Sequence, residues 1–286
     1  MIGKKFTRKL ILKIKSYAKL NLALEIERKN SNGYHEISGI FQSISLFDEI
    51  LIKESKVDSV NINNEDIFQE NNIAFKALKL LKKEMQIKNS FFIEITKNIP
   101  ISSGLGGGSS NAAAIIYGLN NMLSLNLSID EMVSLSRKIG SDIAFFYTGG
   151  TCLVSGLGDK VEKLNNLIVD NFNLLYVPNS MKNKTKEMYN LVNINNFTDG
   201  KKTSDLKKYI SNSQKIKPDN FYNVFFDIAK INFSSVKLSS EEMIKIFNNC
   251  SMSGAGMTLF SVSNKNFNAN KYKQYYPIDV GLEIVS

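Results

Sequence analysis

One stretch of the chain, NIPISSGLGGGSSNAAAIIYGLN at 98–120, has the composition of a main-chain binding site for anions. Its five glycines and four serines leave much of the backbone uncovered by side chains. A helix N-terminus carries unpaired N–H groups and a partial positive charge, and glycines let an anion approach them closely. The stretch therefore predicts a phosphate-binding loop in front of a helix.

The residues on either side of this loop predict the elements that hold it. Phe91, Ile93 and Ile95 recur at every second position, which is typical of a β-strand, and Pro100 ends that strand. After Asn111 come strong helix formers, with apolar residues three to four positions apart. The predicted order is strand, glycine loop, helix.

Two familiar nucleotide-binding motifs do not fit the loop. A Walker P-loop closes on Gly-Lys-Ser/Thr, and here Gly107, Gly108 and Ser109 leave no place for the lysine. A Rossmann loop needs wider glycine spacing and an acidic residue about 20 positions further on. A tight turn capped by Ser109 or Ser110 is the structural alternative, although a cap needs only one serine.

A second candidate region runs from Ser16 to Ile50. Leucine and isoleucine alternate with other residues over 20–26, which predicts a strand with one buried face. Lys19 and Asn21 are two positions apart, so on a strand their side chains point to the same face. The NSNG sequence that follows this strand predicts a turn, and a further strand is expected beyond it.

His35 is the only histidine of the chain, with Tyr34 beside it and Phe41 soon after. A lone histidine is more often structural or simply exposed. Aromatic faces next to a ring with two hydrogen-bonding nitrogens favour a pocket for a nucleobase. For Phe41, packing in the hydrophobic core is the alternative interpretation.

Two further stretches carry groups suited to phosphate chemistry. Asp142 follows a Gly-Ser pair and precedes an apolar run, so we expect its carboxylate to be partly buried and to need a partner. An N-cap of a short helix is the alternative role for Asp142. The sequence SGAG at 253–256 precedes an alternating strand, and it predicts a simple turn or a second main-chain contact to phosphate.

Composition sets the broad class of the protein. A chain of 286 residues with 43% hydrophobic and 22% charged residues is typical of a soluble globular protein of two domains. Its apolar runs are too short for a membrane helix, and its two cysteines lack metal-site spacing, so a cytoplasmic protein is expected. The net charge of +9 favours anionic partners, but no nucleic-acid-binding signature accompanies it. The Asn/Lys-rich stretch at 193–220 predicts a variable surface excursion or a flexible segment with little to bury.

Taken together, these stretches resemble the GHMP small-molecule kinases: a lysine-bearing strand, then GLGGGSS, GSD and SGAG in this order. Within that superfamily, AKLNLALEI, NGYHEI, FQSISLFDEI and GLGGGSSNAA resemble the 4-diphosphocytidyl-2-C-methyl-D-erythritol kinase family, over Tyr17 to about Phe260. The resemblance implies an α+β, two-domain fold with the active site in the cleft between the domains. Residues 1–166 would form a ribosomal protein S5 domain 2-like domain that carries the ATP loop, and 167–286 a ferredoxin-like domain.

The resemblance also assigns roles to individual residues. It implies phosphorylation of the 2-hydroxyl of 4-diphosphocytidyl-2-C-methyl-D-erythritol in non-mevalonate isoprenoid synthesis, with ATP and Mg²⁺ and no assigned metal ligands. The protein would be a monomer or homodimer that acts on a small molecule, with neither nucleic acid nor membrane as partner. The catalytic pair would be Lys19 and Asp142. The ATP-binding residues would be Pro100, Ile101, Ser102, Ser103, Gly104, Leu105, Gly106, Gly107, Gly108, Ser109 and Ser110, and the substrate-binding residues Asn21, Tyr34, His35, Phe41, Thr185 and Tyr189.

These roles make chemical sense for phosphoryl transfer. An aspartate can accept or orient the proton of the attacking hydroxyl, and a lysine can keep that aspartate ionised and steady the transferring group. A hydroxyl from Ser109 or Ser110 would reach the metal, and the sequence does not choose between them. Ala144, Val224 and Ala255 depart from the family pattern, which has proline, aspartate and serine there. The alternative function is a non-catalytic nucleotide- or RNA-binding protein, which would have no need of Asp142 beside Lys19.

Overall fold

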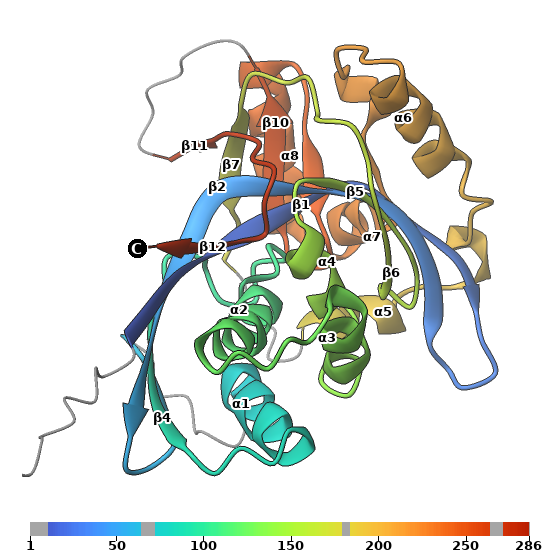
Figure 1. Cartoon of the computed structure of the whole chain (residues 1–286). Coiled ribbons are helices and arrows are strands. Elements are labelled where there is room, and N and C mark those ends of the chain that lie inside the picture. Colours follow the sequence, from blue (N-terminus) through green and yellow to red (C-terminus); the bar gives the residue numbers. More distant parts are fainter. Residues whose placement is uncertain (1–10, 64–71, 179–183, 264–270, 286) are drawn as a thin grey trace, which may run out of the picture.

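The computed structural model describes residues 11–63, 72–178, 184–263 and 271–285. Two β-sheets organise them (Figure 1). The larger, eight-stranded sheet contains β1 (Ile11–Lys29), β2 (His35–Ser55), β3 (Ser59–Ile62), β4 (Ser90–Thr96), β5 (Thr151–Gly156), β6 (Lys160–Lys163), β8 (Tyr222–Asn223) and β12 (Leu282–Val285). The smaller sheet contains β7 (Phe172–Tyr176), β9 (Ser251–Ser253), β10 (Thr258–Val262) and β11 (Lys273–Tyr275).

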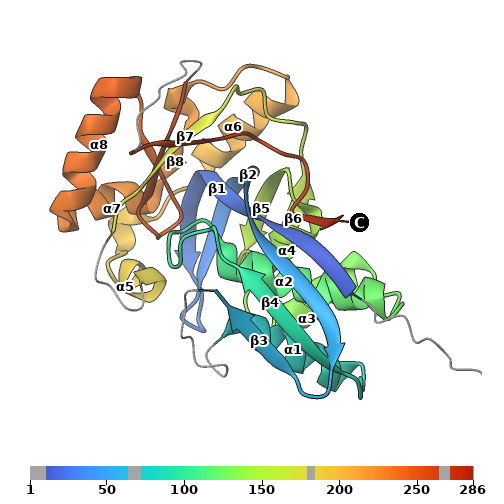
Figure 2. The ribbon, with the colours of Figure 1, turned by 90° about the vertical axis from the view of Figure 1, so that its left-hand side faces the viewer.

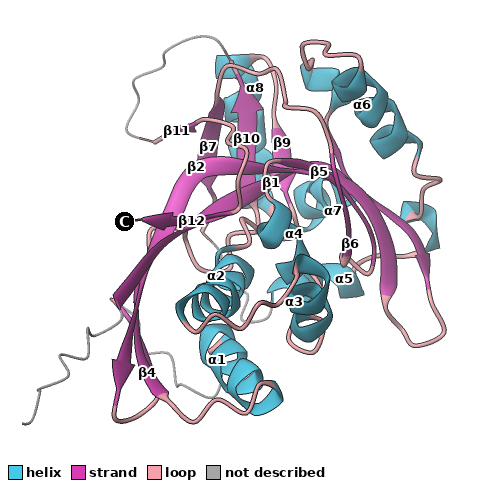
Figure 3. Ribbon diagram, in the orientation of Figure 1, coloured by secondary structure: helices cyan, strands magenta, loops and turns pink. Residues whose placement is uncertain are grey.

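Helices cover the larger sheet on one side, and the smaller sheet lies on its other side (Figures 1 and 2). The first group contains α1 (Ile73–Glu84), α2 (Gly107–Met122), α3 (Ile129–Ser136) and α4 (Ile143–Thr148). The later helices are α5 (Lys184–Asn190), η2 (Ile194–Asn196), α6 (Lys201–Ser211), η3 (Pro218–Asn220), α7 (Val224–Asn232) and α8 (Ser234–Phe247). Figure 3 shows the resulting mixture of helix and strand, and none of the helices among the described residues is long and apolar enough to cross a membrane.

The longest structural unit is the β1–β2 hairpin. It pairs antiparallel from Ile11 opposite Lys53 to Lys29 opposite His35, and the predicted turn lies between the strands. Gly33 of that turn has a φ of 83°, which glycine adopts without strain. Register shifts, including one between Asn21 and Ala23, mark irregularities that bend such strands. Both strands are longer than predicted, with 19 residues in β1 and 21 in β2, so the hairpin runs through the core and ends in an exposed turn.

Hydrophobic residues from both faces of the larger sheet build two cores. On the helical side, Ile52 and Ile93 of the sheet pack with Leu78 and Ala114 of α1 and α2. On the other side, Leu20 and Leu22 of β1 belong to one cluster with residues of the smaller sheet and of α6, including Phe172, Leu206 and Phe260. The middle of β1, residues 16–26, is therefore buried on both faces, which fixes the position of the side chains that it carries.

The predicted order of strand, glycine loop and helix is confirmed, but the helix begins earlier than predicted. It begins at Gly107 rather than after Asn111, and its N-cap is Gly106, with a φ of 74° and no side-chain hydrogen bond. A serine cap is therefore the wrong explanation of the loop. Because no side chain caps this end, its first N–H groups stay open to a ligand.

The prediction for residues 193–220 is correct in that most of the stretch is exposed or half-buried, but it missed the helical structure. This stretch carries η2, α6 and η3, and Thr203, Leu206 and Ile210 of α6 are buried. The α6 helix is polar overall, yet its few apolar residues recur on one face, which is enough to dock it on the sheet. Glu25 of β1 accepts a hydrogen bond of 2.7 Å from the backbone N–H of Thr203, which fixes the start of α6.

The C-terminal part of the chain contributes to both sheets. Every strand of the smaller sheet follows residue 167, while β8 and β12 pair with β1 in the larger one. The SGAG turn connects β9 to β10, in front of a strand as predicted. The α+β fold class is confirmed, and the division into 1–166 and 167–286 stays a prediction.

Candidate active site

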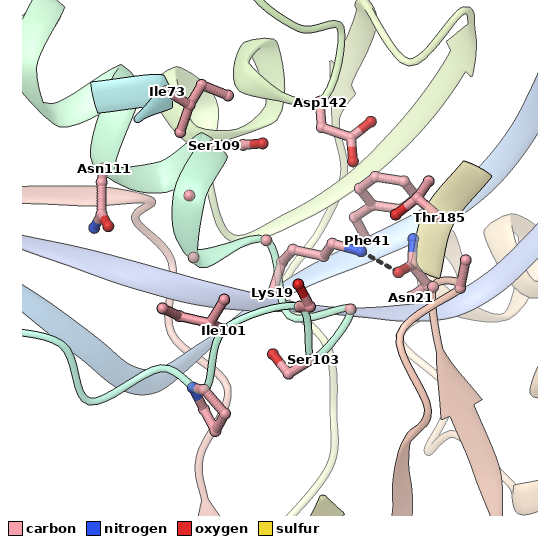
Figure 4. A pocket seen from close by; sticks show the side chains of 18 of the residues that line it. Lys19, Asn21, Phe41, Ile73, Ile101, Ser103, Ser109, Asn111, Asp142 and Thr185 are labelled. Carbon is pink, nitrogen blue, oxygen red and sulfur yellow. Dashed lines mark hydrogen bonds between the residues drawn. The ribbon is translucent and has the colours of Figure 1, made fainter. Parts of the chain in front are cut away.

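A cavity of about 490 Å³ opens beside the N-terminus of α2. Its walls come from segments far apart in the sequence, namely β1, β2, the glycine loop, α5 and the turn between β9 and β10 (Figure 4). Most residues predicted for the site meet there: Lys19, Asn21, Phe41, Pro100, Ile101, Ser102, Ser103, Gly104, Gly106, Gly107, Gly108, Ser109, Asp142, Thr185 and Tyr189.

The glycine loop packs directly against the second glycine turn. A Cβ on Gly104, whose φ is 84°, would lie 2.3 Å from the Ser253 carbonyl oxygen, and one on Gly256 would lie 1.9 Å from the Gly104 nitrogen. Thr258 fixes the same loop, because its Oγ1 donates a 2.7 Å hydrogen bond to the Ser103 carbonyl. Only glycine fits at 104 and 256, where the two turns meet, and this explains the last glycine of the SGAG motif.

Two of the predicted loop residues face the interior of the protein instead of the cavity. Leu105 is buried in the core, and its carbonyl accepts a 2.9 Å hydrogen bond from the Lys19 backbone N–H. Ser110 is fully buried, and its Oγ donates to the Tyr17 carbonyl at 2.8 Å. Ser109 lines the cavity (Figure 4). The structure thus separates the two serines that the sequence left equivalent.

Lys19 lies at the centre of the site, and only 4% of its surface is exposed. Its Nζ donates a hydrogen bond to Oδ1 of Asn21, which confirms that the two side chains share a face of the strand (Figure 4). The same nitrogen lies 5.0 Å from the centroid of the Phe41 ring. Burial lowers the pKa of Lys19 to about 8, although the charge of Asp142 acts in the opposite direction.

Asp142 lies across the cavity and points toward Lys19 and Phe41 (Figure 4). It immediately precedes α4, but its side chain makes no cap hydrogen bond there, so the N-cap explanation fails. Our expectation of a partly buried carboxylate is wrong, because Asp142 is exposed. The apolar run after it is buried instead, and the aspartate remains at the cavity rim. Its negative charge partly offsets the lowering of the Lys19 pKa by burial, and together with burial it raises the pKa of Tyr189.

Aromatic rings form the side of the cavity opposite the glycine loop. Tyr189 of α5 has its ring centroid 5.1 Å from that of His35 and 4.8 Å from that of Phe225. His35 itself is outside the cavity lining, as is Tyr34, which is 65% exposed at the tip of the hairpin. Burial and the nearby charge of Lys29 lower the pKa of His35 below its ordinary value. His35 thus supports the wall through Tyr189.

Sequence reasoning missed a buried ion pair behind the loop. The carboxylate of Asp48 is fully buried, pairs with Nζ of Lys97 and accepts the backbone N–H groups of Asn98 and Ile99, each at 2.8 Å. Lys97 comes directly before the loop, and that adjacency to a glycine-rich segment was an available signal. The remaining cavity residues are Leu24, Ile37, Ile62, Asn72, Ile73, Ala74, Asn111, Phe225, Gly254 and Ala255.

Comparisons with known proteins place the chain in a family. The model of the GHMP kinases N terminal domain matches residues 72–150. A 4-diphosphocytidyl-2-C-methyl-D-erythritol kinase of Alkaliphilus oremlandii is 34% identical over 87% of this chain and 87% of its own length. This chain belongs to that kinase family. The kinase of the same name from Clostridioides difficile is 33% identical over 94% of this chain and 95% of its own.

Solved structures agree on the fold. A crystal structure of 4-(cytidine 5'-diphospho)-2C-methyl-D-erythritol kinase superposes with a TM-score of 0.74 at 22% identity, covering 88% of this chain and 90% of that one. The Methanococcus jannaschii mevalonate kinase gives a TM-score of 0.63 at 21% identity over 91% and 92%. Family membership confirms the predicted kinase class, and the alternative of a non-catalytic binding protein is wrong.

Proposed function

We propose that this kinase transfers the γ-phosphoryl group of ATP to the 2-hydroxyl of 4-diphosphocytidyl-2-C-methyl-D-erythritol, with Lys19 and Asp142 as the catalytic pair. Relatives that align with nearly the whole chain carry the name of that kinase. The observation that carries the proposal is the meeting of the glycine loop, Lys19 and Asp142 in one cavity. We further infer a cytoplasmic enzyme, monomeric or homodimeric, without a nucleic-acid partner.

The phosphates of ATP would bind at the N-terminus of α2. The loop from Pro100 to Ser109 lines the cavity there, and the helix of 16 residues behind it adds its dipole. Lys97 lies next to Gly107, since a Cβ on that glycine would be 2.8 Å from the Lys97 Nζ. Main-chain N–H groups and two lysines, Lys19 and Lys97, thus surround the space in which negative charge would collect.

The two residues of the catalytic pair have different roles in the transfer. The 2-hydroxyl oxygen forms a bond to the γ-phosphorus as the bond to the β,γ-bridging oxygen breaks, and Asp142 accepts the hydroxyl proton. The ammonium of Lys19 stabilises negative charge on the transferring group and attracts the Asp142 carboxylate. Burial strengthens that interaction, because Lys19 is shielded from water while Asp142 retains access to the acceptor.

The oxygen donors of the cavity fit Mg²⁺. Magnesium prefers oxygen ligands and usually takes one or two carboxylates together with substrate phosphates. Within the described ranges no group of three or more His, Cys, Asp or Glu residues forms a dedicated metal cage. The Ser109 hydroxyl, which lines the cavity, would hold the ion together with the phosphates of the substrate. Bound Mg²⁺ would offset the charge of the phosphates.

The cytidyl part of the substrate would bind along the aromatic side of the cavity. Tyr189 and Phe41 offer ring faces, and Thr185 and Asn21 offer polar groups for orientation. His35 would act on the base side by fixing the Tyr189 ring, 5.1 Å away between centroids. The glycine-loop side would thus bind the donor, and this aromatic side the acceptor.

An ADP-release assay with purified protein tests the proposal. We expect ADP release that depends on 4-diphosphocytidyl-2-C-methyl-D-erythritol in the presence of ATP and Mg²⁺. Mevalonate and homoserine serve as comparison acceptors, because kinases of similar fold act on other alcohols. ADP release with mevalonate or homoserine, and none with the cytidyl compound, would contradict the proposed substrate.

A further inference from the structure

Lys184, the first residue of α5, is a buried lysine that none of the steps above uses. Only 4% of its surface is exposed. Its Nζ donates hydrogen bonds to the carbonyl oxygens of Ser102, at 2.8 Å, and Gly256, at 3.3 Å. The first oxygen belongs to the predicted ATP loop and the second to the turn between β9 and β10. One ammonium therefore joins three segments that are far apart in sequence.

The contacts of Lys184 connect neighbouring segments specifically and do not merely fill the space between them. Ser102 has a φ of 54°, a left-handed conformation that non-glycine residues rarely adopt and that needs support from its surroundings. The ammonium also lies 5.6 Å from the centroid of the Tyr176 ring. Burial lowers the pKa of Lys184 below its ordinary value. A desolvated ammonium is costly unless its hydrogen bonds are made, so these contacts resist separation.

The same short helix carries part of the acceptor side. Thr185 and Tyr189 of α5 line the cavity, and Met188 is fully buried and anchors the helix to the core. Displacement of the ATP loop at Ser102 would pull on the first turn of this helix through the Lys184 side chain. Loop and helix therefore share one mechanical link at the edge of the active site.

We propose that Lys184 is a positioning residue that couples the two half-sites, so that ATP bound at the glycine loop strengthens binding of the cytidyl group against α5. The inference rests on the proposed function, because it assumes that ATP and a cytidyl substrate occupy these two sides. When phosphates order the main chain at 102–104, the Lys184 contacts would also order α5. The protein would then lose less conformational entropy when the second ligand binds. By linkage the cytidyl ligand strengthens ATP binding by the same factor.

Calorimetry with cytidine diphosphate tests this coupling. Its dissociation constant is measured with and without a non-hydrolysable ATP analogue in the wild type, in Lys184→Met and in Lys186→Met. Lys186 is an exposed lysine on the same helix and provides the matched control. We expect the analogue to tighten binding by about fivefold or more in the wild type and in Lys186→Met, as for ordinary allosteric coupling. In Lys184→Met the dissociation constant of cytidine diphosphate should be the same without and with the analogue, so the ratio of the two constants falls to about one. Methionine fills similar space but cannot make the two hydrogen bonds.

The outcomes separate the inference from the proposed function. If the wild type binds both probes without coupling, or if Lys184→Met keeps the full ratio, the inference is overturned and the proposed function is untouched. If neither the analogue nor cytidine diphosphate binds the wild type, the proposed function itself fails. Thr258→Val loosens the loop from β10, so it should weaken analogue binding while it preserves the ratio.

Hydrogen exchange on the wild type keeps the inference testable even if Lys184→Met does not fold. Addition of the ATP analogue alone should slow exchange of the backbone amides of α5, which carries no predicted ATP-binding residue. The amides of α6, which docks on the other side of the larger sheet, should stay unchanged and serve as the internal control. Unchanged exchange in α5 would contradict the proposed link.

Discussion

The two sides of the cavity are built in different ways. The phosphate side consists of main chain fixed by buried groups, with Asp48 and Ser110 fully buried behind it. The acceptor side consists of aromatic side chains from a hairpin and a short helix, and Tyr34 beyond it is 65% exposed. Donor phosphates need a fixed array of N–H groups, whereas a base needs ring faces that remain open for entry.

This difference has consequences for substitutions on each side. A change on the phosphate side should disturb folding or ATP binding, because the glycine loop packs closely against the turn between β9 and β10 and against buried groups. A change at Thr185 or His35 on the acceptor side should act on one ligand and leave the fold intact, because Thr185 is exposed and His35 is only half-buried. Three substitutions and a change of pH test that division, from the largest expected effect to the smallest.

Asp48→Asn should have the largest effect, and it should act on stability. The substitution leaves the Lys97 ammonium without its charged partner in a mostly buried position, at a cost of about 3 kcal/mol in the free energy of unfolding. Urea denaturation measures the loss. A change below about 0.5 kcal/mol, the usual size for a surface substitution, would show that the network behind the loop is not needed.

Gly104→Ala should weaken ATP-analogue binding. Its φ of 84° and the Ser253 carbonyl oxygen 2.3 Å from the added Cβ force the loop to shift, at a strain of about 1–3 kcal/mol, or roughly 5–150-fold in affinity. Gly33→Ala is the matched control, since Gly33 has a φ of 83° but nothing within 4 Å of the Cβ. Equal loss of ATP affinity in both variants would mean that backbone conformation alone, and not the packed turn, sets the effect.

His35→Ala should act on the acceptor alone. Loss of the ring pair with Tyr189, worth about 0.5–1.5 kcal/mol, should raise KM for the cytidyl substrate about twofold to twelvefold. KM for ATP should stay within the error of the steady-state assay. An equal rise in both constants would contradict the separation of the two sides.

A rise in pH should have the smallest effect of these changes, and it should weaken binding of the ATP analogue. The pKa of Lys19 is about 8 in the free protein, so its ammonium is mainly present at pH 7 and is lost as the pH rises. If the analogue binds only the charged form, linkage predicts about a fourfold loss of affinity between pH 7 and pH 8.5. Lys19→Met removes this group. The ratio of wild-type to variant affinity, measured at each pH, therefore isolates the contribution of the Lys19 ammonium to analogue binding. A ratio that stays constant with pH would contradict the assignment.

The sequence predicted one side of the site better than the other. The glycine loop was visible in composition alone, because a run of bare backbone before a helix has few other uses. The role of Asp48 was not visible, since its partner Lys97 is distant in sequence and only the fold brings them together. Periodicity predicted the common face of Lys19 and Asn21 but not the contact between His35 and Tyr189, which joins two distant segments.

The errors in the prediction have physical causes. The helical structure of residues 193–220 was missed because the stretch was judged on its composition, although Thr203, Leu206 and Ile210 on one face suffice to dock α6. The exposure of Asp142 was missed because the apolar run after it suggested burial, and that run is buried without it. Of the three departures from the family pattern, Ala144 and Val224 are buried and Ala255 lines the cavity.

Asp142→Asn tests the catalytic pair most directly. The amide keeps the size of the side chain but cannot accept the hydroxyl proton, so kcat in the ADP-release assay should fall by about 10²–10⁴-fold. The dissociation constant of the ATP analogue should change little, because the phosphate side is held by other residues. Full turnover in the variant would remove Asp142 from the mechanism and contradict its pairing with Lys19.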